Sequence, residues 1–292
     1  MTNLIELKKD NILVSSTIIK HEKPEFVYIP VEKDTIFNIK KGEKVNIGSV
    51  IAEVKGKDIF SSISGVPTCV KQMNSMSGLK PFIEIKNDYK ETFHKDRSNK
   101  KTFKAIKKEE LESKINHELK EELNAKKHFI LNCIDDEPYV LTENFNLLKH
   151  GEEFLEFLDE LDKIYHFDTI IICVKSASSE NINQLINTLG AVPHIKLEVC
   201  PNLYLLGNND ISIIMKAHEL NELYNKGKRN SYTSTKLLTI SGNGIHNPSM
   251  ISVKIGSKLE EVVKENINLK KEKLVYFANG IMSGKKIELK ID

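Results

Sequence analysis

The sequence of 292 residues has few cysteines and no tryptophan. Its four cysteines never form a Cys-x-x-Cys pair, whereas iron–sulfur clusters and structural zinc sites take at least two ligands from one tight loop. The cysteines are Cys69, Cys133, Cys173 and Cys200. The sequence therefore predicts no iron–sulfur cluster and no metal site within this chain. A disulfide framework is also not expected, because the sequence shows no secretory signal.

The sequence also lacks an excess of charge of one sign and lacks long hydrophobic runs. The 43 basic residues nearly balance the 41 acidic ones, so nucleic acid is not an expected partner. The longest uncharged apolar run, Thr169 to Val174, is far shorter than the roughly 20 residues that span a bilayer. We therefore expect no transmembrane segment and a cytoplasmic location, with membrane association only peripheral and through partners.

Glycines punctuate the region from Tyr28 to Lys86, in which apolar and polar residues alternate. Four of these glycines stand between short runs, at positions 42, 48, 56 and 65. Glycine adopts the positive φ angles that tight turns require, and alternation is typical of half-buried strands. The region is predicted to be a compact all-β module.

The next region, up to Lys127, is rich in lysine, glutamate and asparagine. Branched apolar residues are almost absent there until Leu111. From Leu111 to Leu123 they recur at helical intervals, with charged residues between them. We therefore expect a charged linker that leads into one amphipathic helix.

From His128 the pattern predicts alternating strands and helices. Short apolar runs at 128–133, 169–174 and 195–199 suit buried strands of a parallel sheet. Apolar residues on one helical stripe predict helices, which we place at 151–164, 178–189 and about 210–225. This order predicts an open α/β sheet. From Lys236 the order of strand, turn, strand, short helix and two further strands suggests a β-grasp.

Four stretches of the sequence, taken in order, resemble the C subunit of the Rnf ferredoxin:NAD oxidoreductase and its relative, the proline-reductase-associated electron-transfer protein. The first is similar to the phrase of the barrel-sandwich hybrid, and the third to that of the soluble-ligand-binding β-grasp. Glu143 lies shortly after the second stretch, at a position where the family usually has an acidic residue. The stretches are Lys41–Gly65, Asn132–Tyr139, Thr239–Leu259 and Asn279–Gly284.

The resemblance implies an α+β multi-domain protein. Together with the patterns described above, the resemblance predicts four parts: an N-terminal barrel-sandwich hybrid at 1–90, a charged linker with a helix at 91–127, a central Rossmann-like α/β domain at 128–232 and a β-grasp domain at 233–292. It also implies that Asn132, Asp135 and Glu137 match residues that line a pocket for FMN and NADH. From the residues alone, the aspartates at 135 and 136 could instead be solvated or cap the following helix, while Glu137 and Pro138 turn the chain.

Two features of the family are missing. The stretch from Lys101 to Lys127 contains no glycine, whereas the family places there a glycine-rich loop that approaches flavin and dinucleotide phosphates. The family also continues, after the stretch that ends at Gly284, into a domain with two iron–sulfur clusters that this sequence lacks. We therefore expect an accessory or docking subunit of a cytoplasmic electron-transfer complex, with no redox cofactor and no enzymatic activity of its own.

Its expected partners are other subunits of an electron-transfer or amino-acid reductase complex, such as proline reductase. Two alternatives stay open. One is an active flavin- and NADH-dependent oxidoreductase subunit that uses Asn132, Asp135 and Glu137. The other is a small-ligand-binding protein that uses the β-grasp.

Overall fold

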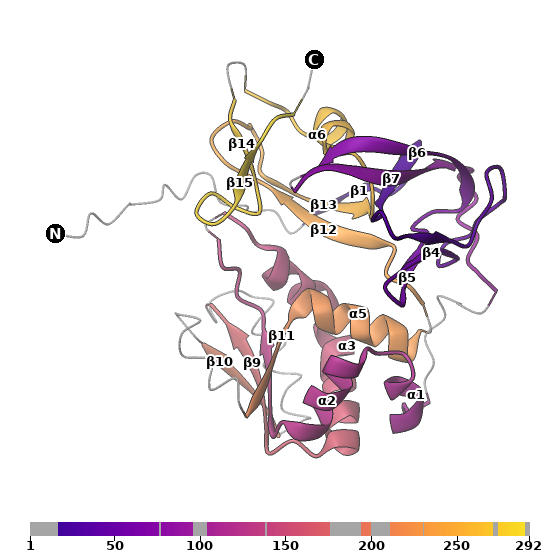
Figure 1. The fold of residues 1–292 in the computed structure, drawn as a ribbon. Helices are drawn as coiled ribbons and strands as arrows, with labels where there is room; N and C mark the ends of the chain where they lie inside the picture. The colour runs from indigo at the N-terminus through magenta and orange to yellow at the C-terminus, as the bar shows by residue number, and fades with distance from the viewer. Residues whose placement is uncertain are drawn as a thin grey trace. The chain divides into compact units, whose positions relative to one another are not determined.

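The computed structural model describes residues 17–75, 77–95, 104–137, 139–175, 194–199, 211–229, 231–270 and 274–289. Within them the protein is mixed α/β, with its strands in several small sheets (Figure 1). This confirms the general fold class. The helix predicted at 178–189 lies outside the described residues.

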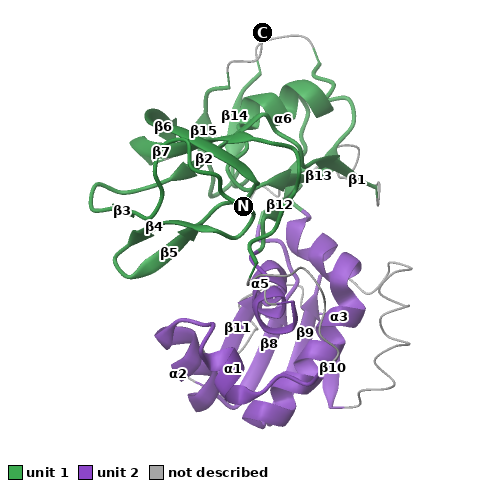
Figure 2. Ribbon diagram, turned by 90° about the vertical axis from the view of Figure 1, so that its right-hand side faces the viewer, with its two compact units in different colours: residues 1–95, 137–140, 233–292 green, residues 96–136, 141–232 purple. Residues whose placement is uncertain are grey.

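The chain divides into two compact units (Figure 2). Unit 1 consists of Met1–Lys95, Glu137–Val140 and Thr233–Asp292, and unit 2 of Asp96–Asp136 and Leu141–Tyr232. The expected division into four parts remains a prediction.

The first part of unit 1 contains two antiparallel sheets, with strand orders β2-β7-β6 and β3-β4-β5. The strands are β2 (Phe26–Pro30), β3 (Ile36–Phe37), β4 (Val50–Val54), β5 (Lys57–Phe60), β6 (Gly65–Ser75) and β7 (Gly78–Asn87). One buried cluster, which includes Val27, Ile51 and Ile85, takes residues from both sheets. Strands are thus present between Tyr28 and Lys86 as expected, although β6 with 11 residues and β7 with 10 are longer than the short strands that the sequence predicts.

The last part of unit 1 has the order of elements that the sequence predicts. It consists of β12 (Thr235–Ile240), β13 (Ser249–Lys254), α6 (Leu259–Asn266), β14 (Tyr276–Ala278) and β15 (Lys285–Ile287). An additional strand, β1 (Ile18–His21), pairs in parallel with β13. The sequence did not predict β1, because its partner strand lies near the other end of the chain.

Contacts at one turn join these two parts of unit 1. The amide of Tyr28 donates to the carbonyl of Gly256 at 2.8 Å, and the Ser62 hydroxyl donates to the carbonyl of Ile255 at 2.6 Å. The Lys258 ammonium lies 4.6 Å from the centre of the Tyr28 ring, which is a favourable cation–π distance. The turn after β13 therefore packs directly on the N-terminal strands.

Unit 2 contains a four-stranded parallel sheet with the order β10-β9-β8-β11. Its strands are β8 (His128–Asn132), β9 (Thr169–Val174), β10 (Ile195–Val199) and β11 (Ser212–Lys216). The helices α3 (Thr142–Tyr165) and α5 (Ala217–Lys228) bury Phe157 and Tyr224 in the same core as the strand residues Phe129 and Ile172.

The helix predicted at about 210–225 is wrong at its start. Residues Ser212–Lys216 form the strand β11, and the helix begins only at Ala217. Ile213, Ile214 and Met215 are consecutive apolar residues, a pattern that fits a buried strand as well as a helix. Parallel pairing with β8 decides in favour of the strand.

The single amphipathic helix expected after the charged linker is two helices, α1 (Lys108–Glu112) and α2 (His117–Ala125). The chain breaks between them because the side chain of Asn116 caps α2, accepting the amide of Leu119 at 2.9 Å. Leu111 and Leu123 are completely buried in the core of unit 2. These helices are therefore part of that unit.

A buried charge anchors the chain just before α1. The ammonium of Lys228 is inaccessible to solvent, pairs with Glu160 and donates to the carbonyl of Lys104 at 3.1 Å. Glu160 also accepts the amide of Ile106 at 3.3 Å. The segment that enters α1 is therefore held by a buried lysine at the end of α5 and a glutamate of α3.

Replacing the buried lysine should destabilise the protein strongly. Lys228→Met leaves the Glu160 carboxylate, whose side chain is only 13% exposed, without its cation, so the free energy of unfolding should fall by about 3 kcal/mol. Lys163→Met is the matched control, because Lys163 pairs with Asp159 but is 70% exposed; its effect should stay below about 1 kcal/mol. Urea denaturation measures both, and equal effects would contradict the assignment.

Candidate functional site

The candidate site lies at the carboxyl ends of β8 and β11 in unit 2. From β8 the chain moves through β9 to β10 at one edge of the sheet, and then returns to β11 on the other side of β8. The strand order therefore reverses between β8 and β11. Open α/β sheets bind ligands outside the carboxyl ends of their strands at such a reversal.

Asn132 and Asp135 both lie at this edge, and both accept backbone N–H groups. Asn132 ends β8, is almost completely buried and accepts the amide of Ile134 at 2.9 Å. Asp135 accepts the amides of Glu143 at 2.9 Å and Asn144 at 3.3 Å. These amides belong to the first turn of α3, so Asp135 caps this helix, one of the roles that the sequence left open.

The environment of Asp135 acts on its acidity in opposite directions. Burial is the largest influence and raises the pKa, while the amides of the α3 first turn lower it and the nearby Glu143 charge raises it further. The resulting pKa is about 6. Loss of water around the carboxylate thus outweighs the helix cap.

Glu143 is a residue of α3, but its carboxylate contacts the first turn of the second helix at this edge, α5. Its Oε1 lies 2.6 Å from Nδ1 of His218, and its Oε2 accepts the amide of His218 at 3.1 Å. The Glu143 carboxylate is buried, whereas the imidazole is about one-third exposed. Beside this pair, the Lys216 ammonium bonds to Asp136 at 2.9 Å.

Sequence reasoning missed His218 and Lys216. Their partners precede them by 75 and 80 residues, and no motif surrounds either residue. The local signal would have been Lys216–Glu219, because Glu219 accepts the amide of Lys216 at 2.8 Å as part of a helix cap. That signal marks the start of α5 but says nothing of Glu143.

Glu137, the third predicted site residue, belongs to unit 1 and not to unit 2. Its carboxylate accepts the amides of Met282 at 2.8 Å and Ser283 at 2.6 Å, and also the Ser283 hydroxyl. These bonds, the hydroxyl's first, lower the pKa of Glu137. The second and fourth family-like stretches therefore meet at this carboxylate.

Gly280 makes this contact sterically feasible. Its φ is +94°, and a Cβ at this position would overlap the side chain of Glu137. Only glycine combines this backbone conformation with such a close approach.

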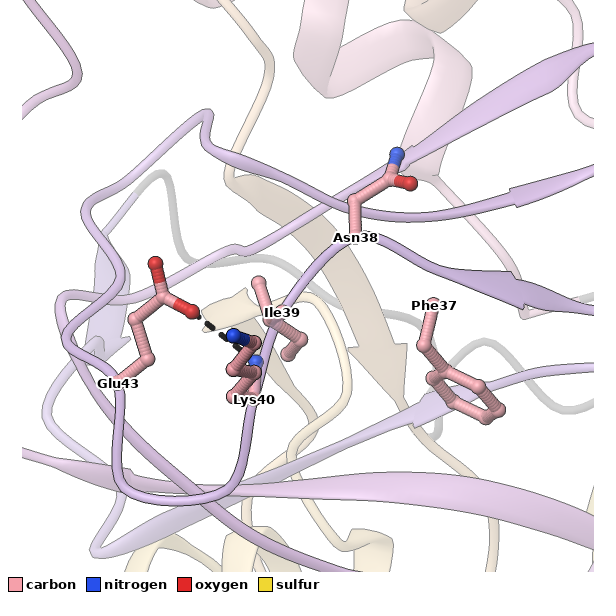
Figure 3. Close-up of a pocket in the computed structure, with 5 residues that line it drawn as sticks. All are labelled: Phe37, Asn38, Ile39, Lys40 and Glu43. Atoms are coloured by element: carbon pink, nitrogen blue, oxygen red, sulfur yellow. Dashed lines mark hydrogen bonds between the residues drawn. The ribbon is translucent and has the colours of Figure 1, made fainter.

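A shallow hollow lies elsewhere in unit 1, beside the short strand β3 (Figure 3). It is lined by Phe37, Asn38, Ile39, Lys40 and Glu43. The Glu43 carboxylate turns back to accept the amide of Lys40 at 3.0 Å. The hollow is thus the surface of one turn, and its carboxylate, Glu43, is hydrogen-bonded within that turn.

Metal-binding chemistry has little support among the described residues. No group of three or more His, Cys, Asp or Glu side chains there could hold a metal ion. Cys133 and Cys173 are buried and Cys69 is exposed, and none of these three is in a disulfide; Cys200 lies outside the described residues. In the same part of the chain, no helix is long and apolar enough to cross a membrane.

Comparison with known proteins does not assign the chain to a family. No family model matches the sequence, and no curated protein matches it.

Stability between pH 4 and 6 should depend on Asp135. Its pKa rises from an ordinary 3.8 to about 6 on folding, so the folded protein binds this proton more tightly than the unfolded chain. The resulting stability is complete below about pH 4 and is lost as the pH rises through 6, by about 3 kcal/mol.

Asp135→Asn should remove this decrease, because asparagine does not titrate. Chemical denaturation of both proteins at several pH values measures it, and Asp58→Asn, at an exposed position in β5, is the control. Parallel pH profiles for the wild type and Asp135→Asn would show that the burial of Asp135 does not matter.

Alanine at position 280 should cost more stability than alanine at another glycine with positive φ. Gly78 has a φ of +100° with open space around its Cβ position, so Gly78→Ala carries only backbone strain of about 1–2 kcal/mol. Gly280→Ala adds the overlap with Glu137. We expect a larger loss in the free energy of unfolding, together with a changed NMR shift of the Met282 amide, and an equal loss would argue against the close contact.

Proposed function

We propose that this chain is an accessory or docking subunit of a cytoplasmic electron-transfer complex, similar to the Rnf C subunit and its proline-reductase-associated relative, and that it binds no redox cofactor itself. The proposal starts from the four family-like stretches, which occur in the family's order along the chain. Its partners would be other subunits of such a complex or of an amino-acid reductase.

The arrangement of strands supports the finer part of the proposed fold. Two antiparallel sheets around one core, followed by strands and a short helix, are compatible with a barrel-sandwich hybrid joined to a β-grasp in unit 1. The four parallel strands of unit 2 are compatible with a Rossmann-like domain. We propose this architecture on the resemblance and on these sheet orders together.

One observation carries the non-catalytic part of the proposal: in the part of the chain that the structure describes, acidic side chains fill the N-termini of α3 and α5 at the carboxyl edge of the sheet. Dinucleotide phosphates bind in α/β domains at such a helix start, where backbone N–H groups and the helix dipole favour an anion. Here Asp135 fills the start of α3 and Glu143 that of α5. At either of these two helix starts, a nucleotide phosphate would have to displace a carboxylate and would meet its negative charge.

The other two residues that a flavin pocket would need are also hydrogen-bonded to backbone amides of the chain itself. Asn132 bonds to the turn after β8, and Glu137 to the loop at 282–283. The stretch from Lys101 to Lys127 contains no glycine for a phosphate-binding loop. The side chains that the structure describes at this edge therefore do not fit FMN or NADH, and we derive no reaction step through either.

The test is cofactor uptake by the purified full-length chain. After incubation with excess FMN and gel filtration, we expect no stoichiometric flavin absorbance, and with NADH and ferricyanide no turnover above the protein-free rate. A flavoprotein handled in parallel is the positive control. Stoichiometric FMN or NADH-dependent turnover would favour the alternative, an active oxidoreductase subunit.

A further inference from the structure

The hairpin of β14 and β15 in unit 1, with the residue before it, exposes several large apolar side chains. Four large apolar side chains between residues 275 and 282 are strongly exposed. They are Val275 at 57%, Phe277 at 45%, Ile281 at 58% and Met282 at 78%. Grouped apolar exposure of this kind is typical of a protein-binding surface, and methionine is frequent where a surface must adapt to its partner.

The carboxylate of Glu137 binds the loop between the two strands. Successive amides at Met282 and Ser283 converge on Glu137, and the Ser283 hydroxyl joins them. Successive backbone N–H groups that converge in this way form an anion-binding nest. We call the loop Asn279–Gly284 the nest loop. One acidic side chain accepts two of its amides, while the side chains of Ile281 and Met282 remain exposed.

The charges next to the nest loop favour an acidic partner. Lys285 and Lys286 follow the loop directly and are both exposed. From Leu274 to Ile287 the sequence contains no acidic residue. A partner that combines carboxylate and apolar side chains would therefore match both the charge and the apolar character of this surface.

We propose that the nest loop, together with Val275 and Phe277, is a docking site for an acidic, apolar segment of a partner protein, whose carboxylate enters the nest in place of Glu137. This inference rests on the proposed docking function and names its surface and the chemistry of the partner. Glu137 shows which ligand chemistry the nest accepts, because it is itself a carboxylate bound there. Its bonds to the loop lie at the surface, so replacing it does not require the core to open.

The experiment uses the chain's own acidic segment as a probe supplied in trans. Two fluorescein-labelled peptides are compared, Ile-Asp-Asp-Glu-Pro-Tyr-Val-Leu, which is residues 134–141, and the same peptide with Gln for the Glu. Fluorescence anisotropy measures their binding to the full-length Glu137→Ala variant, whose nest is vacant. We expect the Glu peptide to bind at least about 10-fold more tightly than the Gln peptide, because the amides of the nest form stronger hydrogen bonds with a charged carboxylate than with a neutral amide.

Wild-type protein should bind the Glu peptide about 10-fold more weakly than Glu137→Ala does, because Glu137 competes for the nest. Met282→Asp, added to Glu137→Ala, should abolish binding. Leu79→Asp, at another strongly exposed apolar position in β7, should leave it unchanged. NMR should place the peptide by shifts of the Met282 and Ser283 amides.

Equal affinities for the two peptides would overturn the proposal, and so would the absence of binding to folded Glu137→Ala. Amide shifts with inorganic phosphate but not with the Glu peptide would also overturn it, because they would indicate a site for free anions. If Glu137→Ala does not fold, Glu137→Gln, which keeps the side-chain length without the charge, is titrated in the same way. Failure here is distinct from failure of the proposed function, because the peptide affinities are measured on Glu137→Ala and report on the nest, whereas cofactor uptake is measured separately on the wild type.

Discussion

Carboxylates that accept backbone N–H groups hold the important turns of this protein in place. The first N–H groups of a helix and the N–H groups of a tight loop have no partner within their own element. Asp135 supplies one to α3, Glu143 to α5 and Glu137 to the nest loop. The segment 135–137 thus serves elements of both units through consecutive acidic residues.

The same interactions have a consequence for ligand binding. A helix start at the carboxyl edge of a parallel sheet is where an α/β domain offers its strongest binding position for a phosphate. When an acidic side chain of the chain occupies that position, the fold remains and the phosphate position is lost. A protein can therefore resemble a nucleotide-binding family and still lack the means to bind a nucleotide, which is the basis of our proposal.

Burial determines how each charged group behaves. Glu137 is near the surface, and its hydrogen bonds favour the ionised form. Asp135 also accepts two amides, but burial dominates and raises its pKa to about 6. Lys228, fully buried, keeps its partner Glu160 within bonding distance. A buried charge without a partner is costly, which explains why the segment before α1 packs closely over this pair.

The sequence alone determined the elements whose signals are local. Alternation and glycines predicted the short strands from Tyr28 to Lys86, and apolar runs predicted β8, β9 and β10. These patterns report how one segment is buried, so they do not distinguish β11 from a helix and do not show the break before Asn116. Only the tertiary structure decided that β1 pairs with β13, that Glu143 meets His218 and that Glu137 enters the nest loop. These partners are far apart in the sequence, and no local preference encodes a contact that forms only when the whole chain has folded.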